Sequence, residues 1–440
     1  MSRHVVIVGG GVIGLCTAWY AVRRGLRVTV VERGGPQRDG CSFGNAGLIV
    51  PSHFVPLAAP GMISLGLRML GNPESPFYVK PRLSWDLLRW GYRFWRAATA
   101  DRVRRSAPLL RDLHLASLAS YEELAEQCGH EFGLQREGLL MLCKTQQALE
   151  HEAQTAHMAR ELGLAAEILD AAQTAARDPG TRYDIVGSVY YPRDAHLAPD
   201  RLMRALQTRL EAQGVCFAWH AEAKAWQTSA VSSGQRRVVW VEAGGQRLEA
   251  DEFVLCAGSW SPATAQGLGL TLLVQAGKGY SLTLQQPRAL PRLGAVCVEA
   301  RLAVTPMMGR LRCGGTLELS GRNQTIDPRR VRGIVRAVPR YYPDFREEDF
   351  VGVEPWCGLR PCSPDGLPYL GRTARYSNLI VATGHAMLGI SLGPITGRLV
   401  AQLLCHERPA IDLALLSPDR HGANDSRPLS AAARSSGAEA

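Results

Sequence analysis

Residues 5–32 read VVIVGGGVIGLCTAWYAVRRGLRVTVVE and decide the fold of this 440-residue chain. The apolar run at 5–8 predicts a strand that is buried on both faces. A glycine-rich turn follows it and opens a helix that ends at Gly25. A second apolar run at 28–31 predicts a neighbouring parallel strand, which ends at Glu32. This order of elements is typical of a dinucleotide-binding βαβ unit.

The turn has the spacing Gly9-x-Gly11-x-x-Gly14, in which each glycine has a separate role. The first allows the tight turn, the second lets the backbone approach a pyrophosphate, and the third lets the helix pack on the strand. Free N–H groups at the start of the helix would bind the phosphates. Glu32 would accept hydrogen bonds from a ribose diol, and its charge disfavours a 2′-phosphate. The spacing fits FAD and NAD, and a βαβ unit that binds nothing is the structural alternative.

The composition fits a globular protein of two domains with a large core, because 46% of the residues are hydrophobic and 20% are charged. The formal net charge is +10, and arginine supplies nearly all of the positive charge. No basic run carries interleaved aromatic residues, so we expect no nucleic-acid partner. The lysines are Lys80, Lys144, Lys224 and Lys278.

Eleven cysteines lie scattered between Cys16 and Cys405 without a CxxC pair, which predicts reduced thiols in a cytoplasmic protein. His151 and His157 are six residues apart, too far for two ligands on one helical face, so we expect no metal site. The apolar run at 5–8 is too short for a signal peptide. We also expect no stretch long enough to cross a membrane.

Three later segments favour FAD over NAD. The loop 41–47, CSFGNAG, consists of small residues that suit close packing of backbone against a flat ring. The second segment is FVLCAGSW at 253–260, and the third is a predicted strand, turn and helix at 378–404. With these segments the chain resembles the D-amino acid oxidase superfamily, and within it the bacterial D-amino acid dehydrogenases. The most specific stretches are residues 42–47, GLRP at 358–361, SPDGLP at 363–368 and ATGHAMLG at 382–389.

The resemblance covers the chain except its C-terminal tail and implies two domains. We expect an α/β fold in which a Rossmann-like FAD-binding domain is interleaved with an α+β substrate domain built on a mixed sheet. The FAD-binding domain would comprise residues 1–80, 195–270 and 350–416, and the substrate-binding domain 81–194 and 271–349. Residues 417–440, rich in Ser, Ala, Arg and Gly, have little to bury, and we expect a disordered tail.

The expected cofactor is FAD, held without a covalent bond, because neither Cys357 nor Cys362 matches an attachment pattern well. Backbone donors in the segment 384–397 would face the edge of the flavin where negative charge accumulates on reduction. The residues expected to bind FAD are Gly9, Gly11, Val12, Ile13, Gly14, Glu32, Arg33, Ser42, Asn45, Ala46, Gly47, Leu48, Ala257, Gly258, Trp260, Gly384, His385, Met387, Leu388, Gly389 and Ile390.

Arg360, in the GLRP stretch, is the leading candidate for substrate binding. A guanidinium binds a carboxylate through two parallel hydrogen bonds, which would fix the α-carbon before the flavin. The resemblance places this arginine beside the substrate carboxylate. The alternative is a structural ion pair, for example with Asp365.

Three further residues are candidates for the catalytic site. His53 follows the flavin loop and could line the substrate side of the ring, or be an ordinary loop histidine. Tyr280 could project toward the substrate if its strand has the required direction. The resemblance places His385 near the flavin, although a histidine satisfied by backbone groups fits equally well.

The segment from Trp85 to Arg96 predicts a helix with arginines on one stripe and tryptophans on the other faces. One interpretation is a helix that packs its aromatic side chains into the second domain. The other is a helix that lies on an anionic lipid surface, as an enzyme that reduces a quinone would need. The expected location is the cytoplasm, and the second interpretation adds a peripheral contact with the inner face of the membrane.

The expected reaction is oxidative deamination of a D-amino acid by hydride transfer from the α-carbon to N5 of FAD. The apolar loop 48–51 favours a compact substrate, and the resemblance is closest to enzymes for cyclic substrates such as D-proline and cis-4-hydroxy-D-proline. The electron acceptor would be a quinone or some other acceptor, but not oxygen. The alternatives are an oxygen-using glycine or sarcosine oxidase, and a non-catalytic dinucleotide-binding subunit of a membrane-associated complex.

Overall fold

The first of two large sheets carries the N-terminal strand. The computed structural model describes residues 2–69, 74–82, 84–231 and 234–421. The sheet has the spatial order β19 (Tyr369–Arg372), β20 (Leu379–Thr383), β13 (Glu252–Leu255), β1 (His4–Val8), β2 (Arg27–Val31) and β9 (Cys216–Ala218). All neighbours are parallel except β19, which is antiparallel to β20. The apolar residues of β1, β13 and β20 are buried, as in a parallel sheet covered on both faces.

Helices α1 (Val12–Val22) and α10 (Gly389–Leu404) pack closely beside this sheet, and α4 (Ala100–Gln127) packs on α10. The contact between α1 and α10 depends on Gly397, where a Cβ would overlap the backbone of Cys16. Residues 386–404 are apolar and long enough to cross a membrane by length and composition alone, which corrects the expectation that no stretch would be. They form a core helix, since 67% of the apolar window is buried inside the protein.

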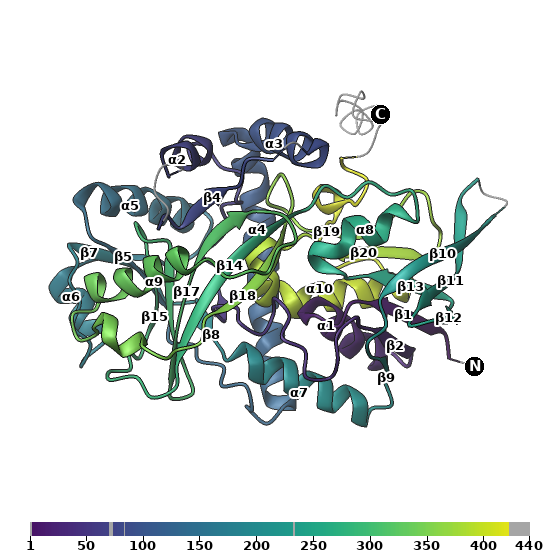
Figure 1. The fold of residues 1–440 in the computed structure, drawn as a ribbon, viewed down its shortest axis with the longest axis horizontal. Helices are drawn as coiled ribbons and strands as arrows, with labels where there is room; N and C mark the ends of the chain where they lie inside the picture. Colours follow the sequence, from purple (N-terminus) through teal and green to yellow (C-terminus); the bar gives the residue numbers. More distant parts are fainter. Residues whose placement is uncertain (1, 70–73, 83, 232–233, 422–440) are drawn as a thin grey trace, which may run out of the picture.

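The second sheet is mixed and has nine strands. Its order is β18 (Trp356–Cys362), β14 (Gln275–Leu284), β17 (Arg310–Leu319), β16 (Leu302–Met307), β15 (Gly294–Cys297), β5 (Leu139–Cys143), β7 (Gly187–Tyr191) and β6 (Glu167–Asp170), and β4 (Phe77–Val79) pairs with β17. Helix α9 (Pro328–Tyr341) packs its apolar side on one face. The two sheets confirm the predicted α/β fold with a mixed second sheet. Figure 1 shows them in the two halves of the molecule.

The other elements connect or cover these sheets. The helices are α2 (Met62–Met69), α3 (Trp85–Ala97), α5 (Gln146–Glu161), α6 (Ala171–Arg177), α7 (Pro199–Ala212) and α8 (Ser261–Gln266), with short 3₁₀ turns η1 (Gly258–Trp260), η2 (Glu347–Phe350), η3 (Ala386–Leu388) and η4 (Ala414–Leu416). Strands β10 (Ala223–Ala230), β11 (Arg236–Ala243) and β12 (Gln246–Glu249) form a small antiparallel sheet, and β3 (Leu48–Ile49) pairs with β8 (Ala195–His196).

The sheets divide the chain differently from the predicted domain boundaries in three places. Strands β4 and β18 lie in segments that we assigned to the FAD-binding domain, yet both belong to the nine-stranded sheet. Helix α4 lies in the segment assigned to the substrate domain, yet it packs on α10 of the other half. Strand pairing and helix packing at the junction join segments that are distant in sequence, so chain order alone does not divide them.

The start of the predicted tail is ordered. Arg420 donates to both carboxylate oxygens of Asp365, at 2.9 and 3.0 Å, and lies 3.9 Å from the centre of the Tyr369 ring. Burial alone would raise the pKa of Asp365, but Arg420 and His421 hold that pKa well below its usual value. The expectation of a disordered tail is therefore wrong for residues 417–421. Residues 422–440 lie outside the described residues.

Candidate active site

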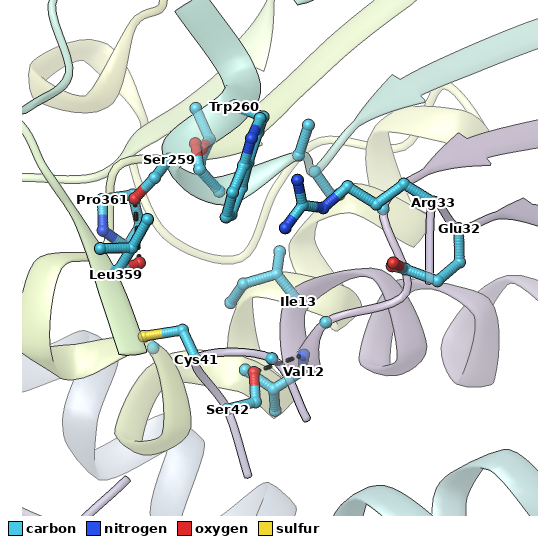
Figure 2. Close-up of a pocket in the computed structure, with 18 of the residues that line it drawn as sticks. Val12, Ile13, Glu32, Arg33, Cys41, Ser42, Ser259, Trp260, Leu359 and Pro361 are labelled. Atoms are coloured by element: carbon cyan, nitrogen blue, oxygen red, sulfur yellow. Dashed lines mark hydrogen bonds between the residues drawn. The ribbon is translucent and has the colours of Figure 1, made fainter. Parts of the chain in front are cut away.

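An elongated cavity of about 430 Å³ opens where the two halves meet. Its walls come from the first turn of α1, the end of β2, the loop 38–45, the end of β13 and the segment that begins α10. Strand β18 of the second sheet adds Leu359 and Pro361. Figure 2 shows Glu32 and Arg33 at one end of the cavity and Leu359 and Pro361 at the other.

The glycine turn forms the floor of this cavity. Gly9 has a φ of +116°, and a Cβ there would overlap the carbonyl oxygen of Cys256 in the neighbouring crossover. A Cβ at Gly14 would overlap the carbonyl oxygen of Gly9, so the helix could not approach the strand. The N–H of Val12 donates to Ser42 Oγ at 3.1 Å, which joins the turn to the predicted flavin loop.

The carboxylate of Glu32 is fixed at the end of β2 by two backbone donors. Gly10 N donates to Oε2 at 2.7 Å, and Gly34 N donates to Oε1 at 2.8 Å. Each carboxylate oxygen can accept a further hydrogen bond, as recognition of a diol requires. Close by, the guanidinium of Arg33 lies over the indole ring of Trp260, 3.4 Å from its centre.

His385 lines the cavity immediately before α10. Its Nε2 lies 3.0 Å from Thr396 Oγ1, while its buried Nδ1 has no hydrogen-bond partner among the described residues. Burial lowers the pKa of His385 to about 3, so the imidazole is neutral at physiological pH. An orphaned polar nitrogen in a cavity wall is a site for a ligand group. The N-terminal end of α10 adds a positive partial charge in the same region.

Arg360 lies on β18 between the cavity residues Leu359 and Pro361, but it is not itself among the residues that line the cavity. It pairs with Gly277 of β14, and its guanidinium lies over Gly279, where a Cβ would overlap it. Arg360 Nη1 donates to the carbonyl oxygen of Thr316 at 2.5 Å.

The alternative of an ion pair between Arg360 and Asp365 is wrong. Asp365 binds Arg420 and also Arg102, the latter at 2.7 Å. Among the described residues Arg360 has no carboxylate partner within salt-bridge distance, so its charge is available to an anionic ligand.

The structure does not bring Tyr280 to the cavity, and we withdraw it as a catalytic candidate. Side chains alternate along β14, and Ser281 points toward the flavin loop, where its Oγ donates to the carbonyl oxygen of Gly44 at 3.0 Å. Tyr280 therefore faces the opposite side, in the core under α9. Its hydroxyl donates to Glu318 Oε2 at 2.8 Å.

His53 also does not line the cavity. Its Nδ1 lies 3.0 Å from Ser52 Oγ, which donates to Asp194 Oδ2 at 2.5 Å. Burial lowers the pKa of His53 to about 4 and raises the pKa of Asp194 to about 7. His53 is therefore one end of a buried chain of hydrogen bonds, and a direct role at the cavity stays a prediction.

Most of the residues expected to bind FAD do line the cavity. They are Gly9, Gly11, Val12, Ile13, Glu32, Arg33, Ser42, Asn45, Ala257, Gly258, Trp260, His385, Gly389 and Ile390. Those that do not line it are Gly14, Ala46, Gly47, Leu48, Gly384, Met387 and Leu388. Gly14 and Gly47 have packing roles, since a Cβ at either would overlap backbone, and Met387 is largely exposed.

Several residues that line the cavity were not predicted from the sequence. Arg38 donates to the carbonyl oxygen of Gly10 at 2.6 and 3.0 Å and closes the turn from outside. Cys41 lines the cavity, and Figure 2 shows its thiol pointing toward β18. Gln324 reaches the cavity from the segment before α9. Proximity to Ser42 could have indicated Cys41, whereas no local signal marks Gln324.

Comparison with known proteins identifies the family. Residues 4–403 match the family described as DAO, FAD dependent oxidoreductase. This chain belongs to the DAO family. The D-amino acid dehydrogenase of Granulibacter bethesdensis is 32% identical over 95% of this chain and 99% of its own length. The enzyme of the same name from Methylobacterium radiotolerans is 34% identical over 94% of this chain and 99% of its own.

Solved structures of the DAO family share the fold. Glycine oxidase from Geobacillus kaustophilus has a TM-score of 0.75 at 24% identity and covers 96% of this chain and 100% of its own. L-Proline dehydrogenase from P. horikoshii has a TM-score of 0.69 at 14% identity, covering 95% of this chain and 97% of its own. These likenesses confirm the predicted fold.

The residues of the cavity fit the FAD of a DAO family enzyme. The side-chain-free turn at Gly9 and Gly11 leaves room for a pyrophosphate, and Glu32 offers free lone pairs to a ribose. At the other end, His385 Nδ1 and the start of α10 suit the polar edge of a flavin ring. The chain is thus an FAD-dependent oxidoreductase, as predicted. The absence of a covalent bond to FAD stays a prediction.

The stability of this enzyme should depend on the protonation of Asp194. The folded pKa of about 7 is above the usual value near 3.9, so the stabilising effect is present at low pH and is lost as the pH rises through 7. We expect the free energy of unfolding to fall by roughly 3 kcal/mol between pH 4 and pH 7 on account of this group.

Urea unfolding of the wild type and of Asp194→Asn across this pH range measures that effect. The amide mimics the protonated carboxyl, since it can accept from Ser52 N and donate to Ser52 Oγ. The difference between the two proteins should therefore change with pH. A difference that is constant from pH 4 to pH 8 would contradict the shifted pKa.

Proposed function

We propose that this DAO family enzyme catalyses the oxidative deamination of a D-amino acid. One observation carries the proposal: Arg360, which lies between the cavity residues Leu359 and Pro361 but does not itself line the cavity, has no carboxylate partner among the described residues. An α-carboxylate would complete a charge-assisted, bidentate pair with it. The relatives named D-amino acid dehydrogenase support the choice of substrate class.

In this mechanism the protein binds and positions the substrate. Arg360 binds the carboxylate, and the carbonyl of Thr316 fixes the orientation of the guanidinium. When bound, FAD would supply the acceptor for the hydrogen and the two electrons of the α-C–H bond of the neutral amine. The start of α10 and the neutral His385 provide a polar, uncharged environment at the far side of the cavity. The imine product hydrolyses in water, or persists if the substrate is cyclic.

A compact, apolar substrate suits the surroundings of Arg360, which supports D-proline or cis-4-hydroxy-D-proline as substrates. Leu317 and Cys362 lie close to Gly277 and belong to a buried apolar cluster with Leu273 and Ala386. This cluster offers no second charge for a substrate side chain. A cyclic side chain would gain apolar contact without losing a hydrogen bond.

The electron acceptor is proposed to be a membrane quinone, and α3 to be the contact with the inner face of the membrane. The inner side of α3 is packed, because Trp90 is buried and its Nε1 donates to the carbonyl oxygen of Cys362 at 2.9 Å. On the outer side, Trp85 is 80% exposed and Trp95 is 62% exposed. The other exposed residues of α3 are Asp86, Leu88, Arg89, Tyr92 and Arg96, so two cations and one anion lie among them.

Both interpretations of the α3 sequence therefore have support, each on one face of the helix. Aromatic side chains next to arginines are typical of a helix that lies in an anionic lipid interface. Figure 1 places α3 at the outer edge of the molecule, where a flat surface can reach it. A cytoplasmic enzyme with this peripheral contact could pass electrons to a lipid-soluble quinone.

Anaerobic addition of amino acids to the purified enzyme tests the substrate class. We expect D-proline, cis-4-hydroxy-D-proline or another D-amino acid to bleach the flavin absorbance, and the L forms to leave it unchanged. In air, a quinone analogue should reoxidise the enzyme faster than oxygen does. Bleaching by glycine or sarcosine, with hydrogen peroxide released in step, would instead establish an oxidase. No bleaching by any D-amino acid would refute the proposal.

Replacing Gly279 by alanine should displace Arg360 without removing any charge. A Cβ at position 279 overlaps the guanidinium, so the carboxylate clamp moves out of line. We expect kcat/KM for the amino acid to fall at least about tenfold, which corresponds to a loss of about 1.4 kcal/mol of binding free energy. The FAD content should be unchanged.

Gly314→Ala is the matched control for this substitution. Gly314 lies opposite Ser281 in the same sheet, and a Cβ there would make only an ordinary contact at 3.5 Å. Its kcat/KM should stay within about twofold of the wild type, since no clash arises. Equal losses in both variants would show that the sheet, rather than the position of Arg360, is sensitive.

Replacing both exposed tryptophans of α3 by serine should weaken lipid binding. We expect Trp85→Ser combined with Trp95→Ser to reduce sedimentation with phosphatidylglycerol vesicles at least about tenfold, because two apolar anchors are lost. Val351→Ser, at an 81% exposed site outside α3, is the control. Unchanged binding of the double variant would refute contact through this face.

A further inference from the structure

The segment 321–327 connects β17 to α9 beside the cofactor cavity. It contains neither helix nor strand, and residues 322–325 are exposed. Gln324 nevertheless lines the cavity. The segment is thus a strap across one side of the FAD site.

Side chains from the sheet below hold this strap at three residues, Gln324, Thr325 and Asp327. Lys278 Nζ donates to the carbonyl oxygen of Thr325 at 2.7 Å. Cys357 Sγ donates to the carbonyl oxygen of Gln324 at 3.0 Å. The hydroxyl of Tyr280 accepts from Asp327 N at 3.4 Å. These three contacts join the strap to strands β14 and β18.

Lys278 is the centre of the arrangement. It is only 2% exposed, and its ammonium group lies 3.3 Å from the carboxylate of Glu318, which also accepts the hydroxyl of Tyr280. Burying a lysine is costly unless its donors are satisfied. An ammonium group can divide its donors between a carboxylate and a carbonyl in different directions, which the flat fork of an arginine does less well. The site thus uses a lysine in a chain whose cations are mostly arginine.

We infer that Lys278, supported by Glu318 and Tyr280, is a positioning residue that holds the strap 321–327 closed over FAD and slows release of the cofactor. The network lies on the face of β14 away from Arg360, so it acts on the cofactor through the strap and does not touch the substrate. The inference rests on FAD binding by the DAO family and is independent of the proposed amino acid substrate.

The test uses the FAD-loaded enzyme with no amino acid present. We expect Lys278→Met to release FAD at least about tenfold faster, followed by the rise in fluorescence of free FAD after dilution. Trypsin should also cut the variant after the exposed Arg322 about tenfold faster, because the strap is no longer held. Mass spectrometry of the fragments identifies the cut.

Lys144→Met is the matched control. Lys144 also combines a carboxylate partner, Asp184 at 2.7 Å, with a hydrogen bond to a backbone carbonyl at 2.8 Å. It follows β5, four strands away from β14 in the sheet, and should leave both rates unchanged. A folded Lys278→Met enzyme with wild-type rates, or equal changes in both lysine variants, would overturn the inference.

Cys357→Ala decides the matter if Lys278→Met does not fold. It removes only the contact to the carbonyl of Gln324 and leaves the buried ion pair in place. We expect release of FAD and cleavage after Arg322 to accelerate together, about threefold each. Acceleration of neither in this variant would then count against the strap. Because no substrate is used, failure here would not bear on the amino acid specificity.

Discussion

The structure depends on close approach of backbones that only glycine permits. At the end of β1, a side chain at Gly9 or Gly14 would overlap a carbonyl oxygen, and a side chain at Gly397 would overlap the backbone of α1. Because these three positions carry no side chain, α1 and α10 can lie against each other and the turn can remain tight. The starts of both helices therefore meet at one cavity, and both contribute positive partial charge there.

The second sheet completes this cavity from the side with a single edge strand. Strand β18 brings Leu359 and Pro361 to the wall and places Arg360 over the glycine at position 279. The same pleat directs Lys278 and Tyr280 to the opposite face, where they hold the strap. One pair of strands thus separates two tasks: a charge for an anionic ligand on one face and retention of the cofactor on the other.

Local patterns predicted the parts of the site that are close in sequence. The glycine turn, Glu32, the flavin loop and the segment before α10 all reach the cavity, because each is a short motif at the end of a strand. Predictions failed where distant segments decide the outcome. Tyr280 faces away from the cavity because of the orientation of its strand. Arg420 is ordered because it pairs with Asp365, which lies 55 residues earlier in the chain. Gln324 reaches the cavity only through its anchors on another strand.

The sequence by itself determined the fold class, the FAD site and the family, since hydrophobic runs, glycine spacing and one acidic residue are local properties of the chain. Tertiary structure alone decided the partner of each arginine, the direction of each side chain on β14 and the course of the strap. These depend on strand register and on packing between segments that lie from 33 to 263 residues apart in the chain. A local pattern cannot encode whether Arg360 has a carboxylate partner, because that depends on where every carboxylate lies in the folded chain.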